Sequence, residues 1–153
     1  MKKIFLTTVL ALGFLVPFTL AAQSNEVLDV FLARAEADFG TSAYLILADC
    51  EKITDTASVD EAMNWIGQSE NLNKLKDLNP DRTISYGEFS YIMMEVLELK
   101  GGLMYSLVPG PRYAAREAAY KRWIIGKSSP GRGLKPFEVI NALVTILEKE
   151  GAR

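Results

Sequence analysis

The chain has 153 residues, of which 49% are hydrophobic, 24% charged and 10% aromatic, and its formal net charge is −2. This globular composition excludes collagen-like, coiled-coil and wholly disordered proteins, and the acidic balance argues against general nucleic-acid binding. The chain has no histidine and one cysteine, which removes the commonest general base, most zinc sites and any internal disulfide. We therefore predict that the protein is not an enzyme.

Residues 1–22 have the pattern of a secretory signal peptide. Two lysines follow Met1, residues 4–20 are uncharged and mostly apolar, and small residues stand at Ala21 and Ala22, where cleavage is expected. The alternative is an uncleaved membrane anchor, but the apolar run is just short of a typical spanning segment and contains a proline. We predict an exported protein of the periplasm or cell envelope, with no membrane span after signal cleavage.

Residues 23–56 are predicted to form an N-terminal helical segment. Apolar residues recur at helical spacing between residues 25 and 38, and Gly40 is expected to end this helix. A second apolar run over residues 43–53 has a similar period and contains Cys50. We expect Cys50 to be a small buried residue, and the alternative is an intermolecular disulfide in an oxidising compartment.

Two capping boxes predict the starts of the next helices. Ser58 to Glu61 and Ser85 to Glu88 each place a glutamate three residues after a serine, so that the two residues cap each other's backbone N–H groups. Apolar residues follow the second box at i, i+3, i+4, i+7 and i+8, and Gly101 is expected to end that helix.

The C-terminal part is also predicted to be helical. An alanine-rich helix is expected over residues 113–125, with Pro111 well placed as the first residue of a helix, and Pro136 is expected to open a last helix. No run of residues alternates as a half-buried strand does. The sequence therefore predicts an all-α protein.

The sequence of residues 57–153 contains an internal repeat. A shift of 50 residues aligns Pro80, Arg82, Glu88, Leu97, Glu98 and Gly101 with Pro130, Arg132, Glu138, Leu147, Glu148 and Gly151. Each unit, about 57–101 and about 111–150, comprises a helix, a polar loop with Pro-x-Arg, and a capped helix. Because a helical hairpin cannot bury its apolar face alone, we predict tandem helix-loop-helix repeats packed with the N-terminal helical segment.

The segment Asn79 to Phe89 resembles the loop and second-helix start of an S-layer homology module. Its signature, an aliphatic residue followed by Thr-Arg-Ala-Glu and an apolar residue, is followed loosely by Ile84 to Phe89 and more loosely by Leu134 to Val139. The chain also resembles helical envelope domains of spirochaetes over Gly101 to Tyr105 and Pro109 to Glu117. The S-layer resemblance covers about 90 residues in two units.

That resemblance implies units arranged around a pseudo-threefold axis, and a function in tethering proteins to cell-wall polysaccharide. In the family, the signature arginine recognises anionic groups of the polymer. The corresponding residues of this chain are Tyr86 and Pro136.

Four arginines are candidate contacts for an anionic polymer or a partner protein. Arg112 and Arg116 lie on one predicted helix, and Arg82 and Arg132 recur in the two loops. Arginine suits this task because its planar fork of donors matches carboxylate and phosphate groups. The alternative is ordinary pairing of surface charges.

The loop 77–88 also has the spacing of an EF-hand-like or dockerin-like calcium loop. Oxygen-bearing side chains occupy positions 1, 3, 5, 7, 9 and 12, which are Asp77, Asn79, Asp81, Thr83, Ser85 and Glu88. Position 6, normally glycine, is Arg82. Glu88 and Glu138 have a simpler explanation as helix-capping carboxylates.

Three functional hypotheses follow. We favour an exported, non-enzymatic binding or scaffolding module of the envelope, whose partner is a cell-wall polymer or an envelope protein, with no cofactor. The alternative is a calcium-binding interaction module that uses loop 77–88. A hydrolase would need two carboxylates that converge in a cleft, and the sequence nominates no such pair.

Overall fold

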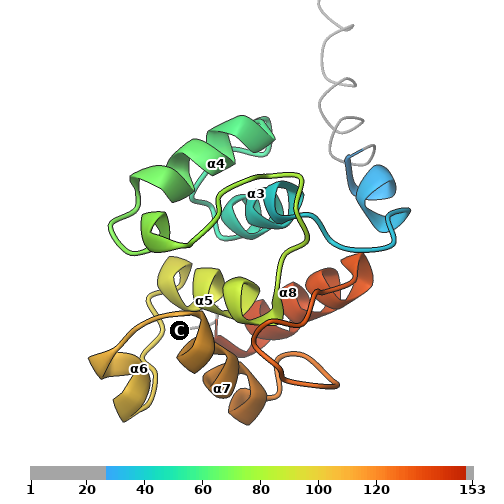
Figure 1. Ribbon diagram of the computed structural model, residues 1–153. Coiled ribbons are helices and arrows are strands. Elements are labelled where there is room, and N and C mark those ends of the chain that lie inside the picture. Colours follow the sequence, from blue (N-terminus) through green and yellow to red (C-terminus); the bar gives the residue numbers. More distant parts are fainter. Residues whose placement is uncertain (1–26, 151–153) are drawn as a thin grey trace, which may run out of the picture.

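The computed structural model describes residues 27–150, so the predicted signal peptide, residues 1–22, lies outside the described range. Over residues 27–150 the chain is helical, with two isolated β-bridges and no strand (Figure 1). The all-α prediction is therefore confirmed. None of the helices in this range is long and apolar enough to cross a membrane.

The helices follow one another with short connections. Residues 27–32 are helical. The later elements are α3 (Phe39–Asp49), α4 (Val59–Gln68), the 3₁₀ helix η1 (Leu72–Lys74), α5 (Tyr86–Val96), α6 (Leu103–Leu107), α7 (Pro111–Lys121) and α8 (Pro136–Glu150).

Both predicted capping boxes are confirmed. The N–H of Ser58 donates to Glu61 Oε2 at 2.7 Å, and the N–H of Glu61 donates to Ser58 Oγ at 3.2 Å. At the start of α5 the corresponding distances between Ser85 and Glu88 are 3.0 and 3.3 Å. Each box satisfies backbone donors that the first helical turn leaves without a partner. The prolines expected to open the last two helices are the first residues of α7 and α8.

The helix predicted over residues 25–38 is wrong at its end, because helix stops at residue 32. Asp38 instead caps α3, and its carboxylate accepts the N–H of Thr41 at 2.8 Å. Gly40 lies in the first turn of α3, where a Cβ would approach the Cβ of Pro80 to 2.7 Å. This glycine is therefore required by close packing and does not terminate a helix.

Two other helices end earlier than their apolar pattern suggests. The helix expected to reach Gly101 ends at Val96, and the one expected to reach residue 125 ends at Lys121. Glu98 and Arg122 lie just after these ends with φ values of 51° and 55°. Glycine is the residue that usually adopts this left-handed conformation, so a non-glycine residue at the position gives no sequence signal for a helix end.

Three backbone segments meet in a closed ring at the starts of α3, α5 and α8. The N–H of Ile84 donates to the carbonyl of Ala37 at 2.9 Å, the N–H of Leu134 donates to that of Ile84 at 3.0 Å, and the N–H of Ala37 donates to that of Leu134 at 2.8 Å. All three residues have no exposed surface. The ring pairs buried polar groups that would otherwise oppose folding.

Helix α5 lies at the centre of the molecule. Tyr86, Phe89, Ile92 and Met93 are fully buried. The most extensive contact between helices joins α5 to α7, and the next joins α3 to α4. Figure 1 shows α3 and α4 on one side of α5 and α6 and α7 on the other. The two polar loops of the repeat lead directly into α5 and α8.

Candidate functional site

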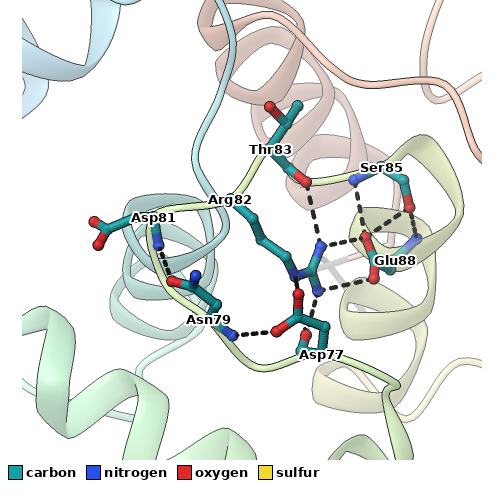
Figure 2. A network of polar contacts seen from close by, with 7 residues as sticks. All are labelled: Asp77, Asn79, Asp81, Arg82, Thr83, Ser85 and Glu88. Carbon is teal, nitrogen blue, oxygen red and sulfur yellow. Dashed lines mark hydrogen bonds and ion pairs between the residues drawn. The ribbon is translucent and has the colours of Figure 1, made fainter.

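The guanidinium of Arg82 lies at the centre of the loop 77–88 (Figure 2). Its Nη1 and Nη2 donate to the two carboxylate oxygens of Glu88 at 2.9 and 2.8 Å. Its Nε donates to the carbonyl of Asp77 at 3.0 Å, and Nη1 also donates to the carbonyl of Thr83 at 3.2 Å. The Arg82 Cζ lies 4.3 Å from the centroid of the Phe39 ring. Only 19% of the side chain is exposed, so Arg82 is an internal brace of the loop.

Other side-chain oxygens of this loop accept hydrogen bonds from the backbone of the same loop. The N–H of Asn79 donates to Asp77 Oδ1 at 2.8 Å, and the N–H of Asp81 donates to Asn79 Oδ1 at 3.0 Å. Such side-chain turns are common where a chain reverses direction. Ser85 Oγ donates to Glu88 Oε2 at 2.7 Å. The six predicted calcium ligands therefore lie in one loop, but most of their oxygens already have partners.

This geometry disfavours calcium at loop 77–88. The positive charge of Arg82 takes both oxygens of Glu88, which a calcium ion would need as its bidentate ligand. Among residues 27–150, no group of three or more cysteine, aspartate or glutamate side chains is arranged to hold a metal ion. Calcium binding stays a prediction that no observed contact supports.

The loop 127–138 repeats the same network. Arg132 Nε donates to the carbonyl of Lys127 at 2.8 Å, and its Nη1 donates to Glu138 Oε2 at 3.0 Å and to the carbonyl of Gly133 at 3.3 Å. Burial alone would raise the pKa of the Glu138 carboxyl, but the hydrogen bonds from Arg132 and the N–H of Lys135, with both positive charges, lower it below its usual range. The two loop arginines thus occupy equivalent structural positions.

Arg112 and Arg116 are placed differently from the loop arginines. Both are exposed on α7, one helical turn apart, and neither forms an ion pair with any residue of the range 27–150. The Arg116 Cζ lies 5.6 Å from the centroid of the Tyr113 ring. Lys121, at the other end of α7, pairs with Glu150 at 2.7 Å. Two of the four candidate arginines therefore lie together on α7, exposed and without an ion-pair partner in the described part of the chain.

The start of α7 also approaches the second loop. A Cβ on Gly87 would lie 2.8 Å from the carbonyl oxygen of Pro111 and 2.9 Å from that of Pro130. Arg112 follows Pro111 directly, so the exposed arginines stand beside a rigid junction of α5, α7 and the loop 127–138.

A cavity of about 580 Å³ lies between residues 27–31, α3 and the segment 55–59. Arg34 lines it and pairs with Asp38 at 2.7 Å, and the Tyr44 hydroxyl donates to the carbonyl of Asp55 at 3.0 Å. Sequence reasoning missed this cavity because its walls come from three separate segments. Among residues 27–150, Asp55 is the acidic residue that lines this cavity.

Cys50 lies just after α3 and is half-buried. Burial, with a smaller effect from the negative charge of Asp49, raises the pKa of its thiol to about 11. The thiol is therefore protonated at neutral pH and is a poor nucleophile.

The geometry of the arginines and the loops is the basis for assigning a function to this chain. No protein-family model matches the chain, and no curated protein and no solved structure matches it.

Proposed function

We propose that the protein is an exported, non-enzymatic component of the cell envelope that binds an anionic cell-wall polymer, or an acidic envelope protein, through Arg112 and Arg116. The observation that carries this proposal is the exposed pair itself: two arginines one turn apart on α7, without ion-pair partners among residues 27–150. Two planar forks at this spacing suit a polymer with repeated carboxylate or phosphate groups.

Arg82 and Arg132 have a positioning role in this proposal. Most of their donors bond to the carboxylates and carbonyls of their own loops, and both side chains are largely buried, so the proposal gives them no contact with the polymer. They hold the two loops that lead into α5 and α8, and the second of these loops meets the start of α7. Of the four arginines predicted to contact the polymer or partner protein, the proposal therefore keeps two, Arg112 and Arg116.

Three further observations support a binding protein of the envelope. The signal-peptide pattern of residues 1–22 directs the chain out of the cytoplasm. The lack of histidine favours binding over catalysis. The hydrogen-bonded ring at Ala37, Ile84 and Leu134 agrees with the threefold arrangement that the S-layer homology resemblance implies.

The test is co-sedimentation of purified residues 23–153 with isolated cell-wall sacculi. We expect pelleting that is insensitive to a calcium chelator and weakened by salt, which screens exposed charges. The variant Arg112→Ala/Arg116→Ala should bind about tenfold more weakly or worse, because each charge-assisted hydrogen bond contributes about 1.5–3 kcal/mol.

The matched control removes two positive charges elsewhere. Lys74 and Lys76 are exposed, lie far from α7 in sequence and form no ion pair within residues 27–150. Lys74→Ala/Lys76→Ala should pellet like the unmodified protein. Equal losses in both variants would show that net charge alone drives the association. A protein that stays in the supernatant would exclude the wall polymer and direct the search to acidic proteins.

A further inference from the structure

The cavity beside α3 combines apolar walls with nearby carboxylates. Val30 and Val59 line it together with Tyr44 and Asp55. Burial raises the pKa of the Tyr44 hydroxyl, and the negative charges of Asp55 and Asp49 raise it further. Both carboxylates therefore lie close to this wall of the cavity.

The part of the chain that builds this cavity is strongly acidic. Residues 27–73 contain nine acidic residues and two basic ones, Arg34 and Lys52. Arg34 also lines the cavity, but it pairs with Asp38 at 2.7 Å. Asp55 and Asp60, the residue after Val59, are exposed and form no ion pair within residues 27–150. The cavity with these two carboxylates, which we call the acidic cavity, therefore carries negative charge that no cation of the described chain neutralises.

An exposed apolar side chain stands among cations elsewhere in the molecule. Ile125 is 94% exposed. From Ala118 to Phe137 the chain has no acidic residue and five basic ones, Lys121, Arg122, Lys127, Arg132 and Lys135. Lys121 and Arg132 pair with glutamates of α8, whereas Arg122 and Lys127 are exposed and form no ion pair within residues 27–150. We call Arg122 to Lys127 the basic segment.

The acidic cavity and the basic segment are on different sides of the molecule. The basic segment directly follows α7, and Figure 1 shows α7 on the other side of α5 from α3 and α4. No residue of the basic segment is among the described residues that line the acidic cavity. The two surfaces therefore do not meet within one copy of the chain, although their charges are opposite.

We propose that copies of this protein associate head to tail, with Ile125 of one copy in the acidic cavity of the next and Arg122 and Lys127 beside its carboxylates. Complementary charges of this kind steer two surfaces together and fix their register. Because the two surfaces differ, each added copy leaves one of each kind free, and association continues as an open chain. The inference goes beyond the proposed function, since it uses neither Arg112 nor Arg116.

The chemistry of the acidic cavity favours this occupant over a free small molecule. Its volume of about 580 Å³ admits a side chain with room to spare, and its valines suit an aliphatic one. The carboxylates of Asp55 and Asp60 repel an anionic amphiphile and attract a cationic surface. Ile125 offers an aliphatic side chain with a free cation three residues before it and another two residues after it.

The test is sedimentation velocity of purified residues 23–153 over a range of protein concentrations. Residues 1–22 are omitted because their apolar run would itself associate, and the core contacts lie within residues 27–150. At about 0.1 M ionic strength, where charges are screened over about 10 Å, the average mass should rise with concentration past the dimer without a plateau. At about 1 M, where screening acts over about 3 Å, association should weaken at least about tenfold.

Two variants each remove one of the surfaces. Arg122→Gln/Ile125→Gln changes the basic segment, and Asp55→Asn/Asp60→Asn neutralises the acidic cavity. Each variant alone should associate at least about tenfold more weakly than the unmodified protein. A mixture of the two should form dimers and nothing larger, because one variant keeps only the acidic cavity and the other only the basic segment.

The matched control is Lys76→Gln/Val144→Gln, which removes an exposed cation and an exposed apolar side chain from outside the basic segment. It should associate like the unmodified protein, and far-UV circular dichroism should show all variants folded. Equal weakening in the control would show that net charge and general hydrophobicity drive the association, and would overturn the proposal.

Other outcomes also overturn it. An unmodified protein that stays monomeric at about 0.1 M ionic strength would leave the cavity to a small molecule. A mass that stops at the dimer would indicate a symmetric contact. The proposal also fails if either variant associates like the unmodified protein, or if their mixture stays monomeric or grows beyond dimers.

The two proposals fail separately. Both association variants retain Arg112 and Arg116 and should still pellet with sacculi. Head-to-tail association without pelleting would remove the wall polymer and leave the self-contact standing, and pelleting of a monomeric protein would do the reverse.

Discussion

Replacing Arg82 by methionine tests whether this arginine braces the loop 77–88 or contacts a ligand. Methionine keeps most of the length of the side chain but removes the donors to Glu88, Asp77 and Thr83. Glu88 then loses its cation while its side chain remains only 16% exposed. If Arg82 braces the loop, Arg82→Met should cause a large loss of stability. If Arg82 is an exposed ligand contact, the substitution should cause almost none.

The expected loss is about 3 kcal/mol. Truncating one partner of a buried ion pair typically costs about 3–5 kcal/mol, and partial exposure of both side chains reduces this figure. For a chain of this size each kcal/mol lowers Tm by about 2–4 °C, so the melting temperature should fall by about 10 °C. Arg132→Met should cost less, about 2 kcal/mol, because Nη2 of Arg132 has no hydrogen-bond partner.

The assay is urea unfolding followed by far-UV circular dichroism, together with sacculus pelleting of the folded variant. A double-mutant cycle with Glu88→Gln should give a coupling energy of about 1–3 kcal/mol, because the two side chains are in direct contact. A loss below about 1 kcal/mol, accompanied by a fall in pelleting, would refute the bracing role and restore Arg82 as a ligand contact.

Three other predictions concern the core and its titrating groups. Gly87→Ala should destabilise the protein by about 1–3 kcal/mol in urea unfolding, because its Cβ would press on two backbone carbonyls. Gly67→Ala, at an exposed position of α4 with open space around the Cβ, should stabilise it by about 0.5–1 kcal/mol. Equal effects of the two substitutions would contradict the packing at Gly87. The lowered pKa of Glu138 contributes stability above about pH 4.3 that is lost as pH falls through the folded-state value, so Glu138→Gln should flatten the acid side of the stability profile. Cys50, with its pKa raised to about 11, should be alkylated at pH 8 about a hundredfold more slowly than a free thiol, and urea should abolish the difference.

Local signals allowed the starts of α4, α5, α7 and α8 to be predicted, whereas α3 begins at Phe39, before the apolar run that predicted it, and α6 had no sequence signal. The serine and glutamate of each capping box interact within one turn, so their spacing alone identifies the structure. The helix ends were harder, because Glu98 and Arg122 adopt the left-handed conformation without a glycine. Gly40 gives the opposite error: a glycine after an apolar run predicts a helix end, whereas this glycine admits Pro80 from a distant segment.

The candidate sites could not be predicted from residue spacing, because they depend on the direction of side chains and on what those side chains contact. The loop 77–88 has the order of oxygens of a calcium loop, yet the direction of the Arg82 side chain decides their partners. The exposure of Arg112 and Arg116 depends on which side of α7 faces the core. The cavity beside α3 joins residues 27–31 to residues 55–59 and had no sequence signal.

The hydrogen-bonded ring also determines how the chain tolerates truncation and how it folds. In an open array of repeats, an end unit can be removed and the remainder still folds, because each unit contacts only its neighbours. Here Ala37 bonds to Leu134 across most of the chain, so removal of either end leaves buried donors and acceptors unpaired on the other two segments. The protein should therefore fold as one cooperative unit, and more slowly than a helical bundle of the same length, because the ring closes only when distant segments meet.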